Sequence, residues 1–268
     1  MVAMTGIGSW ISSAERFRRL LRQTRVLASA NLKARYRKTW AGFIWVVLSP
    51  LIMYAAQAII FMKVLKIETP NYALFLLSGL LPWIFVTQTL DMSASLLLIH
   101  GRIYKSFSVD PLVFISSQVV DNSLNFFAAF TLLLVPAFVT SAVSLWGMLL
   151  AIPALVLMVL NVFFLSLLFS TLNVFYRDTK FVISFGTSVL YFLTPVFYPI
   201  EFIPQKYRIL MHFNPFHHLI APFRSSIYSF QPEVFGSDLI RAAVLTLITG
   251  TLALAFWYRR KGDVYFNV

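Results

Sequence analysis

The basic side chains of Arg35, Arg37 and Lys38 lie close together, directly before a long apolar run. Guanidinium and ammonium groups gathered in this way can give several charge-assisted hydrogen bonds to a phosphate. The sequence patterns of nucleotide-binding loops, zinc proteases and serine hydrolases are absent. The adjacent His217 and His218 would point apart on a helix, and the chain has no Cys to supply a thiolate. We therefore predict no catalytic residue and no metal site.

Two carboxylates, Asp91 and Asp121, stand nearest to the apolar runs. An ionisable residue at membrane depth is a functional hypothesis by default, for instance a proton relay. Both residues fall near the ends of predicted spans, where water, headgroups or a hydrogen-bond partner can reach them. The sequence favours this second interpretation and leaves the first open.

Two predicted helices each carry a face that mixes aromatic rings with a polar group. A polar side chain in hydrocarbon needs a partner, and flat rings would let a sugar slide along them with few hydrogen bonds. The faces are therefore either a channel wall or helix–helix contacts. The candidate lining residues are Phe43, Tyr54, Gln57, Phe61, Phe185, Ser188 and Phe192.

The composition assigns these residues to a membrane protein. Of 268 residues, 59% are hydrophobic and 12% are charged, about half the usual charged share, and the mean hydropathy is +0.79. These values exclude an ordinary soluble enzyme, a disordered chain and a typical nucleic-acid binder. The net charge of +12 is concentrated at the ends of apolar runs, where it faces lipid headgroups.

Six uncharged stretches are predicted to cross the bilayer, which takes about 20 helical residues each. The stretch 122–176 is uncharged over 55 residues, too long for one crossing, and contains a turn near 140–147. Six crossings put both termini on one side, which carries 16 Lys and Arg against 6 on the other. The richer side is expected to be cytoplasmic. The predicted spans are 41–62, 69–90, 113–139, 146–172, 181–198 and 240–258.

Two further segments are expected to meet the membrane without crossing it. In 10–33 the apolar side chains share one helical face and the arginines the opposite face, which is typical of an interfacial amphipathic helix. The segment 199–238 combines many aromatic residues with five prolines and predicts short helices that re-enter from the outer side. The expected fold is thus all-α, with residues 1–268 forming one transmembrane domain.

Five local patterns, in order along nearly the whole chain, resemble the membrane (permease) subunit of ATP-binding cassette polysaccharide exporters of the O-antigen, capsule or teichoic acid type. The loop at 100–111 departs from the family pattern, as does Ala41. The patterns are Arg35-Tyr36-Arg37-Lys38-Thr39 with Gly42, Trp45 and Pro50; Leu77-Ser78-Gly79-Leu80-Leu81-Pro82-Trp83; Phe175-Tyr176-Arg177-Asp178; Thr194-Pro195-Val196-Phe197-Tyr198-Pro199; and Asn214-Pro215.

The resemblance implies an assembly and a location. Two copies of the chain would pair in a bacterial inner membrane, and each would dock a separate subunit that holds ATP and Mg. The substrate would be a polysaccharide on an undecaprenyl-type lipid. No cofactor in this chain and no nucleic-acid partner are expected.

The resemblance also gives roles to the candidate residues. Arg35, Arg37 and Lys38 would meet the lipid pyrophosphate, and the two mixed faces would line the channel. Movements of the ATP-binding subunit would act on the N-terminal helix and the 100–111 loop. The candidate coupling residues are Arg16, Arg19, Arg102, Tyr104 and Lys105.

Three other functions are considered. The first is an exporter of a drug or small lipid, which the ring-rich faces disfavour. The second is a membrane-embedded enzyme acting on isoprenoid-linked sugars, which would need a close set of carboxylates or His with Arg. The third is an ion- or proton-coupled transporter, which would be expected to show buried charges or inverted repeats.

Overall fold

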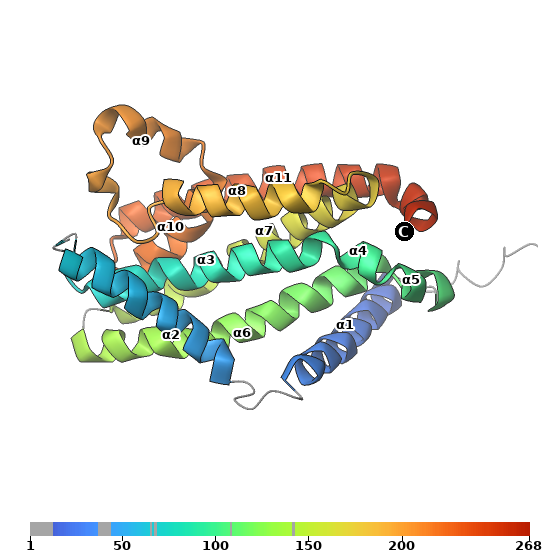
Figure 1. The fold of residues 1–268 in the computed structure, drawn as a ribbon, viewed down its shortest axis with the longest axis horizontal. Coiled ribbons are helices and arrows are strands. Elements are labelled where there is room, and N and C mark those ends of the chain that lie inside the picture. The colour runs from blue at the N-terminus through green and yellow to red at the C-terminus, as the bar shows by residue number, and fades with distance from the viewer. Residues whose placement is uncertain (1–12, 37–43, 65, 67–68, 108, 141–142) are drawn as a thin grey trace, which may run out of the picture.

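The computed structural model describes residues 13–36, 44–64, 66, 69–107, 109–140 and 143–268, and the regular secondary structure in these residues is entirely helical. The elements form an elongated bundle, with the C terminus at one end and α9 projecting from the other (Figure 1). The elements are α1 (Ser13–Tyr36), α2 (Ile44–Ala58), a π-helical turn (Ile59–Val64), α3 (Tyr72–Ala94), α4 (Leu96–Ile99), α5 (Gly101–Phe107), α6 (Pro111–Thr140), α7 (Leu145–Phe175), α8 (Thr179–Leu193), the 3-10 turn η2 (Ile200–Phe202), α9 (Gln205–His212), α10 (Pro215–Ile227) and α11 (Pro232–Asn267).

Five of the described helical segments are long and apolar enough to cross a membrane: α2 with its π-helical turn, α3, α6, α7 and α11. The sixth expected span, 181–198, corresponds to α8, which has only 15 residues. At about 1.5 Å per residue this length falls short of a bilayer core of about 30 Å. The helix ends because Thr194 is extended before Pro195, and the residue before a proline disfavours helical geometry.

Helix α3 is the centre of the bundle, because it is mostly buried whereas α2 is mostly exposed. It lies between α6 on one side and α8 on the other (Figure 1), and it also contacts α7 and α10. Polar side chains tie some of the apolar helices together. Asn161 on α7, fully buried, donates to the hydroxyl groups of Thr249 (3.0 Å) and Thr246 (3.4 Å) on α11. Such bonds fix the lateral register of helices where lipid supplies no alternative partner.

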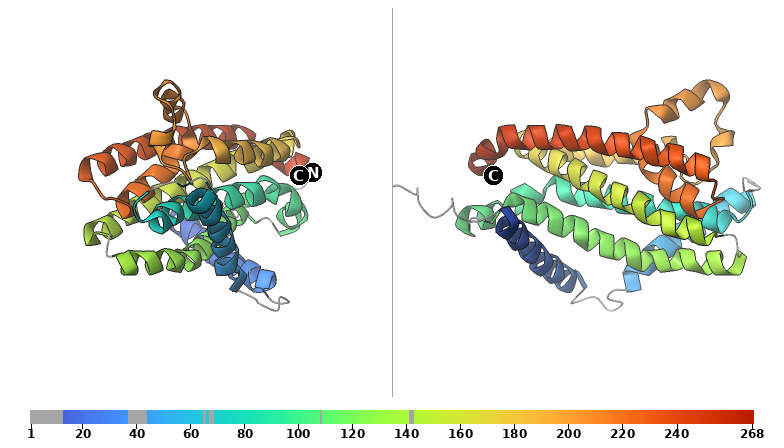
Figure 2. Two further views of the ribbon diagram at one scale, coloured as in Figure 1. Left: turned by 60° about the vertical axis from the view of Figure 1, so that its left-hand side comes forward. Right: turned by 180° about the vertical axis from the view of Figure 1, so that it is seen from behind.

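The segment expected to re-enter at 199–238 holds η2, α9, α10 and the first turns of α11. Asn214 starts α10, because its side-chain oxygen accepts hydrogen bonds from the backbone N–H groups of Phe216 (3.0 Å) and His217 (3.2 Å). Helix α10 is then buried among α3, α7 and α11 through Phe223 and its apolar neighbours. It is therefore part of the core, while α9 projects away from the bundle (Figure 2).

Helix α1 covers most of the segment expected as an interfacial helix. It packs against α6 (Figure 2). Thr24 and Ala28 are buried. Its arginines at positions 18, 19, 22 and 25 are exposed, and so are Phe17 and Leu21. One face of α1 is thus buried against the bundle, and its exposed surface carries apolar and basic side chains together.

The contact between α7 and α10 provides a stability prediction. A Cβ at Gly147 would lie 2.1 Å from the backbone oxygen of Ser226, whereas a Cβ at Gly236 on α11 would meet nothing within 4 Å. We expect Gly147→Ala to lower the free energy of unfolding by about 1–3 kcal/mol, as overpacking does. The matched Gly236→Ala should be neutral or slightly stabilising. Thermal unfolding in detergent measures both, and equal melting temperatures would show that α7 and α10 are not closely packed.

Candidate functional site

A buried ion pair joins α1 to α6. The Nη2 atom of Arg35, in the last turn of α1, lies 2.5 Å from Oδ2 of Asp121. The carboxylate is fully buried, whereas the arginine side chain is 29% exposed. Asp121 stands ten residues inside α6, so the expectation that water reaches it at a helix end is wrong. The alternative in that expectation, a partner for the charge, is what the structure contains.

A polar network extends this pair to α3. The side chain of Asn122 accepts from Arg35 Nη1 (3.5 Å) and donates to the hydroxyl of Thr89 (3.1 Å). The sulfur of Met92 lies within 3.9 Å of the Arg35 guanidinium. Buried polar groups are tolerated when they are partnered, and these contacts bring three helices together around Arg35.

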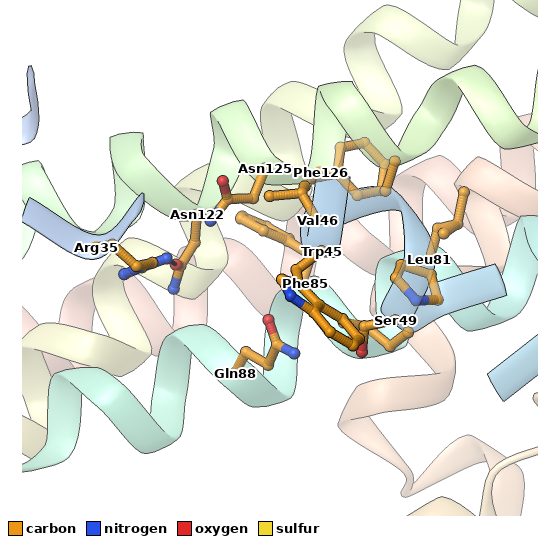
Figure 3. Close-up of a pocket in the computed structure, with 13 residues that line it drawn as sticks. Arg35, Trp45, Val46, Ser49, Leu81, Phe85, Gln88, Asn122, Asn125 and Phe126 are labelled. Atoms are coloured by element: carbon orange, nitrogen blue, oxygen red, sulfur yellow. Dashed lines mark hydrogen bonds between the residues drawn. The ribbon is translucent and has the colours of Figure 1, made fainter. Parts of the chain in front are cut away.

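A cavity of about 230 Å³ opens beside this network, between the end of α1 and helices α2, α3 and α6 (Figure 3). Arg35 and Asn122 lie at one end, and the amides of Gln88 and Asn125 face the space between aromatic rings. The labelled rings around it are those of Trp45, Phe85 and Phe126. Amides both donate and accept hydrogen bonds, so the cavity suits hydroxyl groups on an otherwise flat apolar ligand.

The predicted phosphate cluster is only partly within the described residues. Arg35 borders the cavity, and its guanidinium is held by Asp121, so it is a fixed rather than a free cation. Arg37 and Lys38 lie outside the part of the chain that the structure describes. A phosphate contact at these residues stays a prediction.

The two faces predicted to line a channel have different environments in the structure. On the first span, Gln57 is buried and donates to the hydroxyl of Tyr191 on α8, and the Phe61 ring lies 4.5 Å from that of Phe197. Tyr54 is half-buried against the same core, and Phe43 lies outside the described residues.

The second face has a different environment. On α8, Phe185 and Phe192 are 74% and 69% exposed, and Ser188 is exposed between them. Within one chain, therefore, the first-span face packs against its neighbours and the α8 face stays open.

The candidate coupling residues lie at the end of the bundle that carries the C terminus. Arg19, Arg102 and Lys105 are exposed, and Lys105 Nζ lies 6.0 Å from the centre of the Tyr265 ring. Helix α5 also contacts the end of α11 (Figure 1). The side chains of Arg16 and Tyr104 lie outside what the structure describes.

Sequence reasoning did not identify the amides of this site, Gln88, Asn122 and Asn125. Each is an uncharged polar residue within a predicted span or beside its end, and that is the signal that could have singled them out. What the sequence could not supply was their common location, because they come from two helices.

The ion pair generates a prediction with a definite asymmetry. Arg35→Gln leaves Asp121 buried without a counter-charge and should cost about 3–5 kcal/mol. Asp121→Asn should cost less, about 1–3 kcal/mol, because the arginine is partly exposed and can reach water. The double variant should lose less than the sum of the two. Thermal unfolding in detergent measures all three.

The matched control is Asp263→Asn, which removes the partner of Arg260 from a pair in which both side chains are about half exposed. It should change stability by less than about 1 kcal/mol. If the Arg35 and Asp121 variants behave like this control, the buried pair does not hold α1 on α6.

Comparison with known proteins gives a consistent picture. The profile of the ABC-2 type transporter family matches residues 22–228. An O-antigen export system permease protein of Klebsiella pneumoniae is 30% identical over 74% of this chain and 77% of its own length. One of Myxococcus xanthus is 27% identical over 88% and 91%. A polysialic acid transport protein of Escherichia coli is 21% identical over 86% and 90%. The chain therefore belongs to the ABC-2 type transporter family of membrane proteins.

Proposed function

We propose that this chain is the permease subunit of an ATP-driven exporter that moves a lipid-linked, O-antigen-like polysaccharide across a bacterial inner membrane. The observation that carries the proposal is the similarity, over 74% and 88% of the chain, to permeases named for O-antigen export. The site supports it, because the cavity offers amides, rings and a fixed cation together.

The proposed topology has six crossings with both termini in the cytoplasm. The five long helices supply five of them, and α8 with the turn at 194–198 supplies the sixth. The excess of Lys and Arg at the ends and in the α5 loop supports this orientation. In this topology α1 lies at the cytoplasmic interface, and η2, α9 and α10 dip in from the outer side.

The substrate enters in this proposal at the cytoplasmic end of the first span. Arg37 and Lys38 attract the lipid pyrophosphate, and Arg35 presents the remaining cation at the mouth of the cavity. The glycan then passes between two copies of the chain. The exposed α8 face (Phe185, Ser188 and Phe192) supplies a wall of this path. On the first span Tyr54, Gln57 and Phe61 are packed within the chain, and Phe43, outside the described residues, stays a predicted lining residue.

Energy comes from two copies of a separate ATP-binding subunit, which hold ATP and Mg. These subunits dock on the cytoplasmic end of the bundle. The coupling residues there are Arg16 and Arg19 on α1 and Arg102, Tyr104 and Lys105 on α5. Arg35 lies at the far end of α1 and is bonded to α6, so a push on α1 reaches the entry site directly.

The proposal predicts the effect of neutralising the entry cluster. Cells that carry the triple variant Arg35→Gln, Arg37→Gln and Lys38→Gln should lose most surface polysaccharide, as cells without the chain do. They should also accumulate lipid-linked glycan inside. The measurement is immunoblotting of surface and internal glycan, alongside the amount of the chain in the membrane fraction.

The matched control is Arg259→Gln, Arg260→Gln and Lys261→Gln, which removes the same charges from the exposed end of α11. It should leave export near normal. Normal export by the entry variant would make these residues topological anchors only, and normal surface glycan in cells lacking the chain would contradict the proposed function.

A further inference from the structure

A second and larger cavity lies at the end of the bundle opposite the C terminus. Its volume is about 570 Å³, within the range of about 300–1,000 Å³ typical of small-molecule sites. Its walls come from the entry to α3, the stretch that follows α8, helix α10 and the first turns of α11. It shares no residue with the cavity beside Arg35.

Arg224 on α10 is a rigidly held cation in the wall of this cavity. Its guanidinium donates to the backbone oxygens of Pro195 (2.5 Å) and Val196 (2.6 Å) and stacks 4.4 Å from the centre of the Phe75 ring. The absence of a side chain at Gly79 makes room for it, because a Cβ there would lie 1.7 Å from Nη2. Burial lowers the pKa of Arg224 to about 10, which leaves it charged at neutral pH.

No carboxylate in the described residues forms an ion pair with Arg224, and its Nε is buried without a hydrogen-bond partner. Two carboxylates nevertheless line the same cavity. Glu201 on η2 is in no ion pair within the described residues, and Asp238 on α11 pairs only at 3.7 Å with Arg241. Asp238 is also hydrogen-bonded to the side chain of Ser225, and Glu201 is exposed. The cavity thus carries one held cation and two carboxylates, and neither carboxylate pairs with that cation.

This charge pattern selects the ligand chemistry. A phosphate would meet the two carboxylates, and a metal cation would meet Arg224, so neither suits the space. Carboxylates accept hydrogen bonds from hydroxyl groups, and a guanidinium donates to hydroxyl oxygens. The exposed ring of Phe202 adds a flat apolar surface. Burial lowers the pKa of His217 to about 4, so this wall residue is neutral at physiological pH.

We propose that this cavity is a binding site for one or two neutral sugar units, separate from the entry site and at the opposite end of the bundle. The proposal rests on the proposed function, in which a glycan leaves the membrane at this end. A sugar held here engages Glu201 and Asp238 with its hydroxyl groups and lies against Phe202. The site would hold the leading end of the glycan while the following units cross.

The absence of native Cys allows a labelling test on the full chain in lipid nanodiscs. Gln231→Cys places a thiol in the cavity wall, and the nearby Glu233→Cys, an exposed position outside the lining, is the matched control. The probes are mannotriose, galactotriose and chitotriose, with inorganic phosphate and calcium chloride as comparators. One or more trisaccharides should slow maleimide labelling of Gln231→Cys by about tenfold at nine-tenths occupancy, because only the empty fraction reacts. Labelling of Glu233→Cys should not change.

The second test measures trisaccharide affinity by calorimetry on chains that carry a single substitution and no introduced Cys. Glu201→Gln, at an exposed position, should lower the affinity for the most tightly bound trisaccharide by about tenfold or more, because a hydrogen bond to a charged group is lost. Asp238→Asn should act likewise, and Glu233→Gln should have no effect.

Three results would overturn the proposal: no trisaccharide protects the Gln231→Cys thiol, both thiols are protected alike, or phosphate or calcium protects instead. If the chain supports export but gives any of these results, only the proposed sugar site is contradicted. A chain that exports no glycan contradicts the proposed function, whatever the cavity binds.

Discussion

A polar side chain inside a lipid bilayer has no water to bind, so its partner has to come from the protein. The buried carboxylate of Asp121 is a demanding case, and Arg35 meets it from α1, which is not among the five described helices long and apolar enough to cross a membrane. Asn122 and Thr89 extend this contact to α3, and Asn161 makes an equivalent tie from α7 to α11. The positions of these helices follow from where their polar groups can be satisfied.

The same requirement divides the bundle into a fixed part and an open part. Helices α3, α6, α7, α10 and α11 are interlocked, whereas α2 is mostly exposed and α8 presents exposed rings. In a channel built from two copies, the open helices are the ones free to face the substrate. In the proposed mechanism, in which α1 lies at the cytoplasmic surface, the Arg35 contact links that surface to the entry cavity, so one interaction would serve both stability and coupling.

The class of the protein was predictable because composition and uncharged run length report directly on the solvent around a helix. Five of the six predicted spans coincide with helices long enough to cross, and α8 is shorter because Pro195 ends it early. The resemblance to exporter permeases is confirmed at the family level by the match over residues 22–228. The pairing of Arg35 with Asp121 was not predictable, because 86 residues separate them and local periodicity carries no information on contacts between helices. The contacts of Arg224 with Phe75 and with the backbone of Pro195 and Val196 were not predictable for the same reason.

The central claim is that this chain forms a path for a lipid-linked glycan, and that ATP hydrolysis drives the movement of the glycan along this path. The most direct measurement uses sealed vesicles that contain the chain and its ATP-binding partner, with lipid-linked polysaccharide on the outer leaflet and an added glycosidase. We expect the glycan to become protected from the glycosidase only when ATP and both subunits are present. Glycan that stays accessible with the complete system, or that is protected equally without ATP, would contradict this claim.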